Sequence, residues 1–255
     1  MQPRQPEWAW QWSEFDDPVE WLFADWIAPN HLADFAGKLV LDAGCGHGRH
    51  AALVARRAAR VVAVDLNTAA VARRRAGAAA NIEFLAGDVA GFDDGRRFDA
   101  IYSVGVVHHT DDPDVTVAHL RALLKPGGRL ILWVYSREGN ALNRLFLEPL
   151  KAAILSALPR PVLDIFSHAL TAWLYPLIWS VYLLPMSALP YYEYFANWRR
   201  LPYWRNRLNV FDKLNAPVTH FITRERALSW MSGLVDVHLS PYLGASWRIS
   251  GTAPR

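Results

Sequence analysis

The sequence predicts an α/β protein built on a doubly wound parallel sheet. Between residues 39 and 135, short apolar runs typical of buried strands alternate with stretches rich in Ala, Leu and Arg that are typical of helices. This alternation predicts parallel strands with helices on both faces of the sheet. Acidic residues end several of the runs, and ligands of such sheets bind at the C-terminal strand ends. We therefore expect a ligand site along that edge.

The first expected strand, Leu39–Ala43, leads directly into a turn with glycine at three alternate positions, Gly44, Gly46 and Gly48. Glycine lets the backbone turn sharply and approach a ligand closely, because it has no Cβ. The third glycine comes one residue too early for the G-x-G-x-x-G pattern of dinucleotide sites. Asp42 would repel a diphosphate but could hold the cationic amino group of an amino-acid ligand. The turn therefore favours S-adenosylmethionine over NAD.

The other core elements follow at the spacing of β-α-β units. The second expected strand, Val61–Asp65, ends in an acid where a ribose diol would be held. A turn at Lys125–Gly128 leads into the fifth strand. The remaining helices and strands are expected over residues 49–59, 81–89, 98–104, 115–124 and 128–135.

Taken together, these motifs resemble class I S-adenosylmethionine-dependent methyltransferases, in particular the small-molecule group with the methyltransferase domain 11/12 pattern. The resemblance rests on the glycine turn, Asp65, Gly87–Val89, the run 99–109 and the segment 123–128. It implies that S-adenosylmethionine is the cofactor and that the chain is an enzyme.

The same resemblance implies a set of cofactor-binding residues. They are Asp42, Gly44, Cys45, Gly46, Asp65, Leu66, Asp88, Val89 and Ser103. Asp42 and the first two glycines would contact the methionine part, Asp65 the ribose hydroxyls and Asp88 the adenine amino group. Leu66 and Val89 would flank the adenine ring.

The resemblance further implies a Rossmann-like sheet of seven strands, the last of them antiparallel. Two late apolar runs, 235–240 and 246–251, supply the sixth and seventh strands, so the C-terminus belongs to the core. Thr223 can cap a helix before them, and residues 210–217 resemble a linker of the same group. The expected parts are an N-terminal helical segment (1–37), a core (38–138 and 210–255) and a mainly helical insertion between strands five and six (139–209).

The insertion is very apolar and aromatic. Residues 169–189 carry no charge and are long enough to cross a bilayer. A single crossing would separate the last two strands from the first five, and Pro176 and Pro185 would break the helix. Two interpretations stay open: an apolar lid, or an element lying on an anionic membrane, which the aromatics and arginines of residues 191–207 suit. Both predict a lipophilic or aromatic acceptor.

The N-terminal segment is aromatic as well. Trp8, Trp10 and Trp12 alternate along it, and Trp21 and Trp26 follow. In related methyltransferases the region before the first strand closes over the cofactor and substrate, so a lid is one expectation. A helix packed on the edge of the sheet is the other.

Methyl transfer requires an aligned acceptor and, for a hydroxyl acceptor, removal of a proton. His108 and His109 follow the fourth strand, at the expected substrate mouth, and are the candidate catalytic bases. We prefer His109, and the alternative is that both only pack; Asp212 and His220 are weaker candidates. The sequence thus predicts methylation of a hydrophobic small molecule or lipid, on oxygen in preference to carbon. Two alternatives remain: another transfer to a quinone or lipid by the same fold, and a non-catalytic interaction module.

Composition restricts the other classes of function. The chain has 255 residues, of which 52% are hydrophobic and 20% charged, so it can bury a large core. Its only cysteine, Cys45, cannot form an internal disulfide, and packing in the turn is its favoured role. The net charge of +3 is small for a nucleic-acid binder, and no metal-ligand spacing occurs. We expect neither nucleic acid nor metal, and a cytoplasmic protein with or without peripheral contact at the inner face of the membrane.

Overall fold

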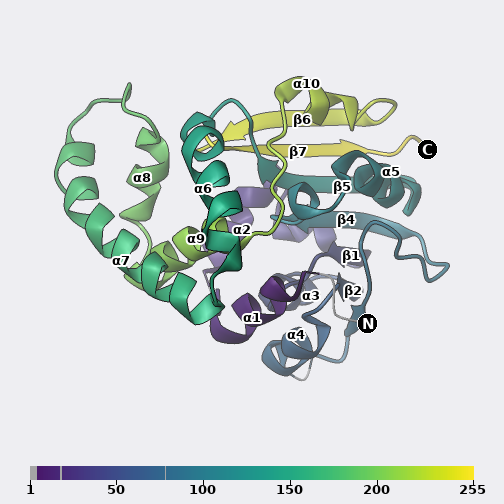
Figure 1. The fold of residues 1–255 in the computed structure, drawn as a ribbon. Helices are drawn as coiled ribbons and strands as arrows, with labels where there is room; N and C mark the ends of the chain where they lie inside the picture. Colours follow the sequence, from purple (N-terminus) through teal and green to yellow (C-terminus); the bar gives the residue numbers. More distant parts are fainter. Residues whose placement is uncertain (1–4, 18, 78) are drawn as a thin grey trace.

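The computed structural model describes residues 5–17, 19–77 and 79–255, and shows a single sheet with helices on both faces (Figure 1). β1 to β5 are parallel, while β7 runs antiparallel between β5 and β6. The seven-stranded doubly wound sheet with an antiparallel last strand is therefore confirmed. The strands are β1 (Leu39–Ala43), β2 (Arg60–Asp65), β3 (Ile82–Ala86), β4 (Phe98–Val104), β5 (Leu124–Tyr135), β6 (Val235–Tyr242) and β7 (Ser246–Thr252).

The strand order places a crevice above β1. The order is β3-β2-β1-β4-β5-β7-β6, so the chain first builds outward from β1 in one direction and then continues from its other side with β4. Connections leave β1 and β4 toward opposite faces of such a sheet, and ligands bind between them at the C-terminal strand ends.

Alternate side chains of the strands face two separate cores. Leu41 and Val62 belong to one buried cluster, and their neighbours Val40 and Val61 belong to another on the opposite face. Both faces are therefore covered, as a parallel sheet requires. The covering helices are α2 (Glu20–Ile27), α3 (Arg49–Ala55), α4 (Ala69–Ala76), α5 (Pro113–Ala122) and α10 (Arg224–Ser229).

Several element ends differ from the sequence expectation by a few residues. The helix expected over 49–59 ends at Ala55. β5 begins at Leu124, before the expected turn, because Leu124 pairs with Phe98 and residues 125–128 form a bulge in the ladder. The Thr223 cap is confirmed, since its side chain accepts a hydrogen bond from the Arg226 N–H.

The segment expected to be a linker is helical. Residues 210–215 are the second half of α9 (Tyr203–Asn215), which also crosses the expected end of the insertion. Val210, Phe211 and Leu214 lie at helical spacing and are buried in a third apolar cluster. The linker expectation was wrong because these side chains pack against Leu163 and Trp198 of the insertion.

The insertion also contains α6 (Glu148–Ala153), α7 (Arg160–Ile178) and α8 (Tyr192–Trp198), preceded by the π-helical turn η3 (Asn143–Leu147). α7 continues through Pro176 and ends two residues later, and Pro185 lies outside any helix. The stretch 169–189 is therefore interrupted as expected, although not at Pro176 itself. In the part of the chain that the structure describes, every helix is too short or too polar to span a bilayer.

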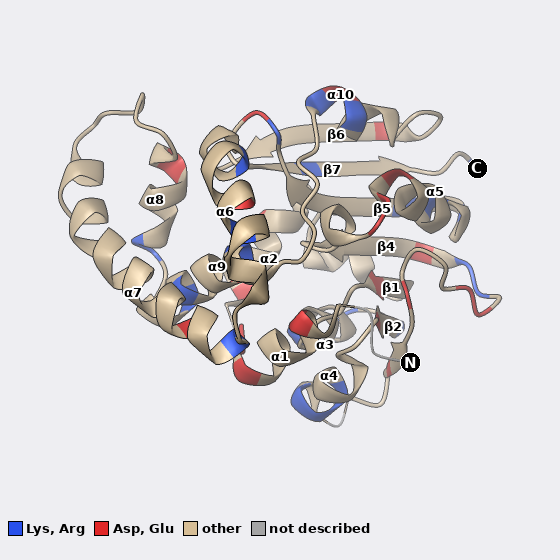
Figure 2. Cartoon of the chain, viewed as in Figure 1, with Lys and Arg blue, Asp and Glu red and all other residues tan. Residues whose placement is uncertain are grey.

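Large exposed apolar side chains gather on the insertion. Of the nineteen in the described chain, fourteen lie between residues 142 and 186. We call these fourteen the apolar flank: Leu142, Leu145, Phe146, Leu150, Ile154, Ile165, Phe166, Leu170, Trp173, Trp179, Val181, Leu183, Leu184 and Met186. In Figure 2 the ribbon of α7 is uncharged along most of its length.

Candidate active site

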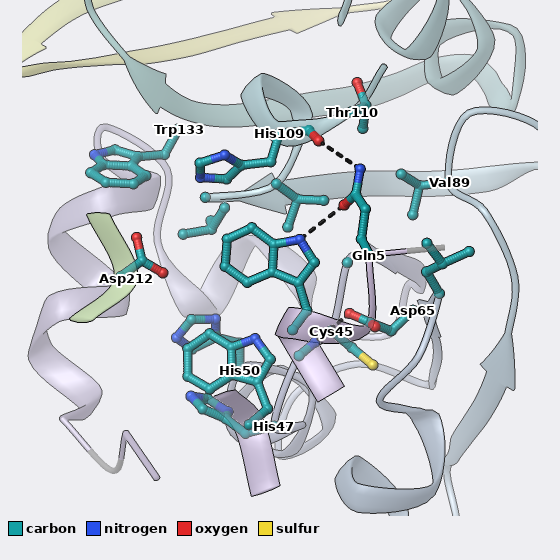
Figure 3. Close-up of a pocket in the computed structure, with 18 of the residues that line it drawn as sticks. Gln5, Cys45, His47, His50, Asp65, Val89, His109, Thr110, Trp133 and Asp212 are labelled. Atoms are coloured by element: carbon teal, nitrogen blue, oxygen red, sulfur yellow. Dashed lines mark hydrogen bonds between the residues drawn. The ribbon is translucent and has the colours of Figure 1, made fainter. Parts of the chain in front are cut away.

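A cavity of about 210 Å³ lies at the C-terminal strand ends (Figure 3). It brings together most of the cofactor-binding residues expected from the sequence. Those that line it are Gly44, Cys45, Gly46, Asp65, Leu66, Asp88 and Val89. In Figure 3, Cys45, Asp65 and Val89 lie toward one end of the cavity, and Trp133 and Asp212 toward the other.

The glycine turn is fixed by backbone geometry. Gly44 has φ of 96°, and a Cβ there would lie 2.3 Å from a methyl carbon of Val106. Only glycine therefore fits this position without displacing Val106. The Gly46 N–H donates to Asp65 Oδ2 at 2.9 Å, while Asp65 Oδ1 accepts from the backbone N–H of Thr68. One carboxylate thus holds both the turn and the start of α4 beside the cavity.

Asp42 lies at the end of β1 but does not line the cavity. The residue is 2% exposed, and its Oδ2 has no hydrogen-bond partner among the described residues. Burial raises the pKa of Asp42 to about 7. A buried carboxylate oxygen with no partner, next to a glycine cradle, fits the cationic amino group of S-adenosylmethionine.

Ser103 is also absent from the cavity wall. It is fully buried, and its hydroxyl donates to the Ala43 carbonyl at 2.7 Å. This bond joins β4 to the end of β1, so the visible contact of Ser103 is structural.

The helix α1 (Pro6–Glu14) covers the cavity. Trp8 and Trp12 line it, and a Cβ on Gly46 would lie 3.2 Å from Trp12 Nε1. Gln5 accepts a hydrogen bond from the Trp8 indole at 2.9 Å and donates to the His109 carbonyl at 3.3 Å (Figure 3). α1 therefore lies beside the cavity, and its closure over cofactor and substrate stays a prediction.

By contrast, α2 packs on the face of the sheet over the inner strands β4 and β5, not on the edge of the sheet. Phe23 is fully buried, and its ring lies 5.3 Å from that of Tyr102 on β4. The Trp26 ring lies 5.3 Å from that of Trp133 on β5. The N-terminal segment thus has one helix over the cavity and one on the face of the sheet.

Of the two candidate bases, only His109 lines the cavity. His108 is fully buried, with its ring centroid 4.1 Å from that of His109 and 4.3 Å from that of Tyr135. His109 Nδ1 lies 2.7 Å from the Val218 carbonyl oxygen, which can only accept, so Nδ1 carries the proton. The lone pair of the neutral ring is then on Nε2.

Burial lowers the pKa of His109, although the Asp212 carboxylate acts in the opposite direction. Asp212 lines the same cavity from α9. Its Oδ2 accepts from the Tyr135 hydroxyl at 3.0 Å, and its Oδ1 accepts from Gln11 of the lid at 2.8 Å. The sequence singled out Asp212 only weakly, and it gave no indication of Tyr135 or Gln11.

A second cavity, of about 250 Å³, adjoins the first. The insertion supplies much of its wall, including Leu147, Leu174 and Phe195. The residues that line both cavities are Trp26, Trp133, Tyr135, Arg205 and Asn209. The first cavity therefore has a polar end at the glycine turn and an aromatic end next to an apolar chamber.

A buried ion pair lies in the wall between the cavities. Arg205 Nε is 2.9 Å from Asp17 Oδ2, and both side chains are more than nine-tenths buried. Burial raises the pKa of Asp17, while Arg205 opposes the shift. Sequence reasoning missed this pair, because its members lie at opposite ends of the chain and neither belongs to a motif.

Comparisons with known proteins agree with this site. Residues 41–132 match the family model described as a methyltransferase domain. The "Ubiquinone biosynthesis O-methyltransferase" of Acinetobacter baylyi is 33% identical over 171 residues, which cover 62% of this chain and 68% of that protein. The "tRNA U34 carboxymethyltransferase" of Alteromonas mediterranea is 32% identical over 170 residues, or 61% of this chain. The chain spans about half the length of that second relative, 49%.

A solved structure shows the same fold. The N-methyltransferase NodS from Bradyrhizobium japonicum WM9, in complex with S-adenosyl-L-homocysteine, aligns with a TM-score of 0.52 at 15% identity. The alignment covers 96% of this chain and 92% of that one. These relatives and the site leave no support for a non-catalytic interaction module. The chain belongs to the class I S-adenosylmethionine-dependent methyltransferases, and S-adenosylmethionine is its cofactor.

Proposed function

We propose that the enzyme transfers the methyl group to a hydroxyl oxygen of a lipophilic, ring-bearing small molecule. The observation that carries this proposal is the second cavity, whose apolar wall meets the cofactor cavity at Trp26, Trp133 and Tyr135. Aromatic walls suit a ring at the reacting end, and the apolar chamber suits a hydrocarbon substituent.

His109 is the proposed general base. Bound S-adenosylmethionine supplies a methyl group already activated on its sulfonium. His109 Nε2 would take up the proton that the acceptor oxygen loses as it gains the methyl group, and S-adenosylhomocysteine would be the leaving product. Asp212 is placed to stabilise the imidazolium that results, since its carboxylate already favours the protonated form of His109. α1 excludes water while the groups are aligned.

The relatives support this proposal to different degrees. The name of the Acinetobacter relative describes O-methylation in ubiquinone biosynthesis, which is compatible with an acceptor bearing a ring. The name of the Alteromonas relative describes a different transfer, of a carboxymethyl group to tRNA. We therefore retain non-methyl transfer as a second candidate, and the absence of a nucleic-acid partner stays a prediction. Product mass separates the two candidates.

We also propose that the insertion contacts an anionic membrane peripherally. The aromatic and arginine residues of 191–207 support this proposal, as does the exposure of the apolar flank. A membrane would be the natural source of a lipophilic acceptor.

The test is methylation of a series of alkylcatechols with chains of increasing length. We expect kcat/KM to rise with chain length, and Leu174→Trp to remove this rise by filling the second cavity. No methylated phenol across the series, or a rate independent of chain length, would contradict the acceptor class.

His109→Gln should lower kcat about a hundredfold or more if the histidine is the base. The depressed pKa of His109 means that the wild-type rate should fall only below about pH 6.5, as the ring gains a proton. The variant should lack this acidic limb, and His168→Gln, at an exposed position, should retain it. If the His109→Gln enzyme keeps the wild-type rate and pH profile, His109 is not the general base.

A further inference from the structure

We propose that the apolar flank docks on an anionic lipid bilayer and that the acceptor passes from the bilayer directly into the second cavity. This inference rests on the proposed lipophilic acceptor, and it assigns a surface and a route to the membrane contact.

The apolar side chains of the flank are highly exposed to solvent. Trp173 is 70% exposed, Ile165 69% and Phe146 67%. No Lys, Arg, Asp or Glu occurs between Asp164 and Glu193. A large apolar patch of this kind marks an interaction surface. Its tryptophans suit the bilayer interface, because an indole ring is mostly apolar and carries one polar N–H group.

The charge of the insertion favours an anionic partner. Residues 139–209 hold seven of the 27 Lys and Arg but only three of the 24 Asp and Glu. Two of the seven, Arg160 and Arg205, pair with Glu7 and Asp17 outside the segment, which leaves a surplus of two positive charges. Arg144, Arg199 and Arg200 form no ion pair within the described residues. An anionic bilayer attracts such a segment by about 1 kcal/mol for each basic residue near its surface, or about fivefold in binding.

The same charge disfavours a second copy of the chain as the occupant. A symmetric dimer through the apolar flank would bring two insertions, each with a surplus of positive charge, face to face. Their repulsion would oppose the apolar contact, whereas an anionic bilayer would add to it.

The apolar flank is continuous with the second cavity. η3 supplies Asn143 and Leu147 to the cavity wall while exposing Leu145 and Phe146. On α7, Leu170 belongs to both surfaces, being 39% exposed and a wall residue of the cavity. The helices that would enter the lipid thus also enclose the chamber, and an apolar acceptor would not need to cross water.

The experiment is flotation of the whole protein with vesicles of phosphatidylcholine, with and without phosphatidylglycerol. We expect the protein to float, and to do so more with phosphatidylglycerol at low salt. The variant Phe146→Ser/Ile165→Ser/Trp173→Ser should reduce the bound fraction about tenfold or more. The matched control Val115→Ser/Leu228→Ser/Val237→Ser removes three exposed apolar side chains outside the apolar flank and should float as the wild type does.

Methylation rates, measured beside flotation, distinguish a failure of the docking surface from a failure of the proposed function. With a short alkylcatechol in solution, the flank variant should keep the wild-type rate; with a long alkylcatechol in vesicles, its rate should fall together with flotation. If neither catechol is methylated by the wild type, the proposed function fails. If both are methylated but the wild type does not float, or the flank variant floats equally, the docking surface fails. If the wild type is a dimer and the flank substitutions dissociate it, a second copy of the chain covers the apolar flank. This result would contradict docking on a bilayer.

Discussion

Asp42 combines deep burial with an unpaired carboxylate oxygen, which is an unfavourable arrangement for a charged group. Its pKa is raised from the ordinary value of about 4 to about 7. The folded protein therefore holds a proton on Asp42 where the unfolded chain has released it. This contribution to stability is complete at low pH and is lost as the pH rises from about 4 to about 7. A bound cation would compensate the charge.

Asp42→Asn should therefore stabilise the enzyme without ligand while weakening cofactor binding. At pH 8 the gain in free energy of unfolding has an upper bound of about 4 kcal/mol, and it should shrink as the pH falls toward 4. Urea unfolding at several pH values measures the gain, and calorimetry with S-adenosylhomocysteine measures the binding. Asp93→Asn, at an exposed position, serves as the control. Equal destabilisation at all pH values would show that the carboxylate is structural.

At the scale of elements, the buried side chain of Gln11 is one of the attachments of the lid α1 to the rest of the site. Gln11 is fully buried and donates to Asp212 Oδ1 at 2.8 Å, while its carbonyl accepts from Asn215 at 3.0 Å. Asp212 also accepts from Tyr135 of β5. The lid, the proposed acceptor side and the sheet therefore share one hydrogen-bond network, and we expect α1 to move when the cofactor exchanges.

Gln11→Leu should loosen the lid. It removes a donor from Asp212 and an acceptor from Asn215, at a cost of about 1–3 kcal/mol to the closed arrangement. Dissociation of S-adenosylhomocysteine should accelerate about fivefold or more, as measured by stopped-flow fluorescence of the lid tryptophans. Ser13→Ala alters the exposed side of the same helix and should leave this rate unchanged. An unaltered rate in Gln11→Leu would show that the network does not hold the lid.

The elements with local signals could be predicted from the sequence, and those built by long-range packing could not. β1 and its glycine turn lie within ten residues, which contain both an apolar strand pattern and glycines where the backbone requires them. The Thr223 cap is likewise local, because its side chain bonds the backbone three residues later. Tyr135 and Asp212 are 77 residues apart and meet only because α9 folds over the end of β5. The linker expectation for 210–217 failed for the same reason, since the helix is stabilised by the insertion it contacts.

The whole molecule concentrates buried ionisable groups around its two cavities. Burial lowers the pKa of four histidines, to about 3 for His50; the four are His47, His50, His108 and His109. The unfolded chain takes up protons on all four below about pH 6.5, while burial opposes this uptake in the fold, so acid favours unfolding. Asp17 and Asp42 act in the opposite direction, because their pKa values are raised in the fold.

These contributions predict that the free energy of unfolding decreases as the pH falls below about 6.5. Four histidines against two carboxyls give a net uptake of at most about two protons on unfolding, so the free energy of unfolding should fall by up to about 3 kcal/mol per pH unit between about pH 6.5 and 5. His50→Phe, which keeps a ring against Phe23, should reduce this slope by about 1.4 kcal/mol per pH unit, and the exposed His168→Gln should not. Urea unfolding followed by tryptophan fluorescence measures both. A flat profile, or an unchanged slope in His50→Phe, would mean that water reaches these rings in the folded state and that the cavity is not closed in solution.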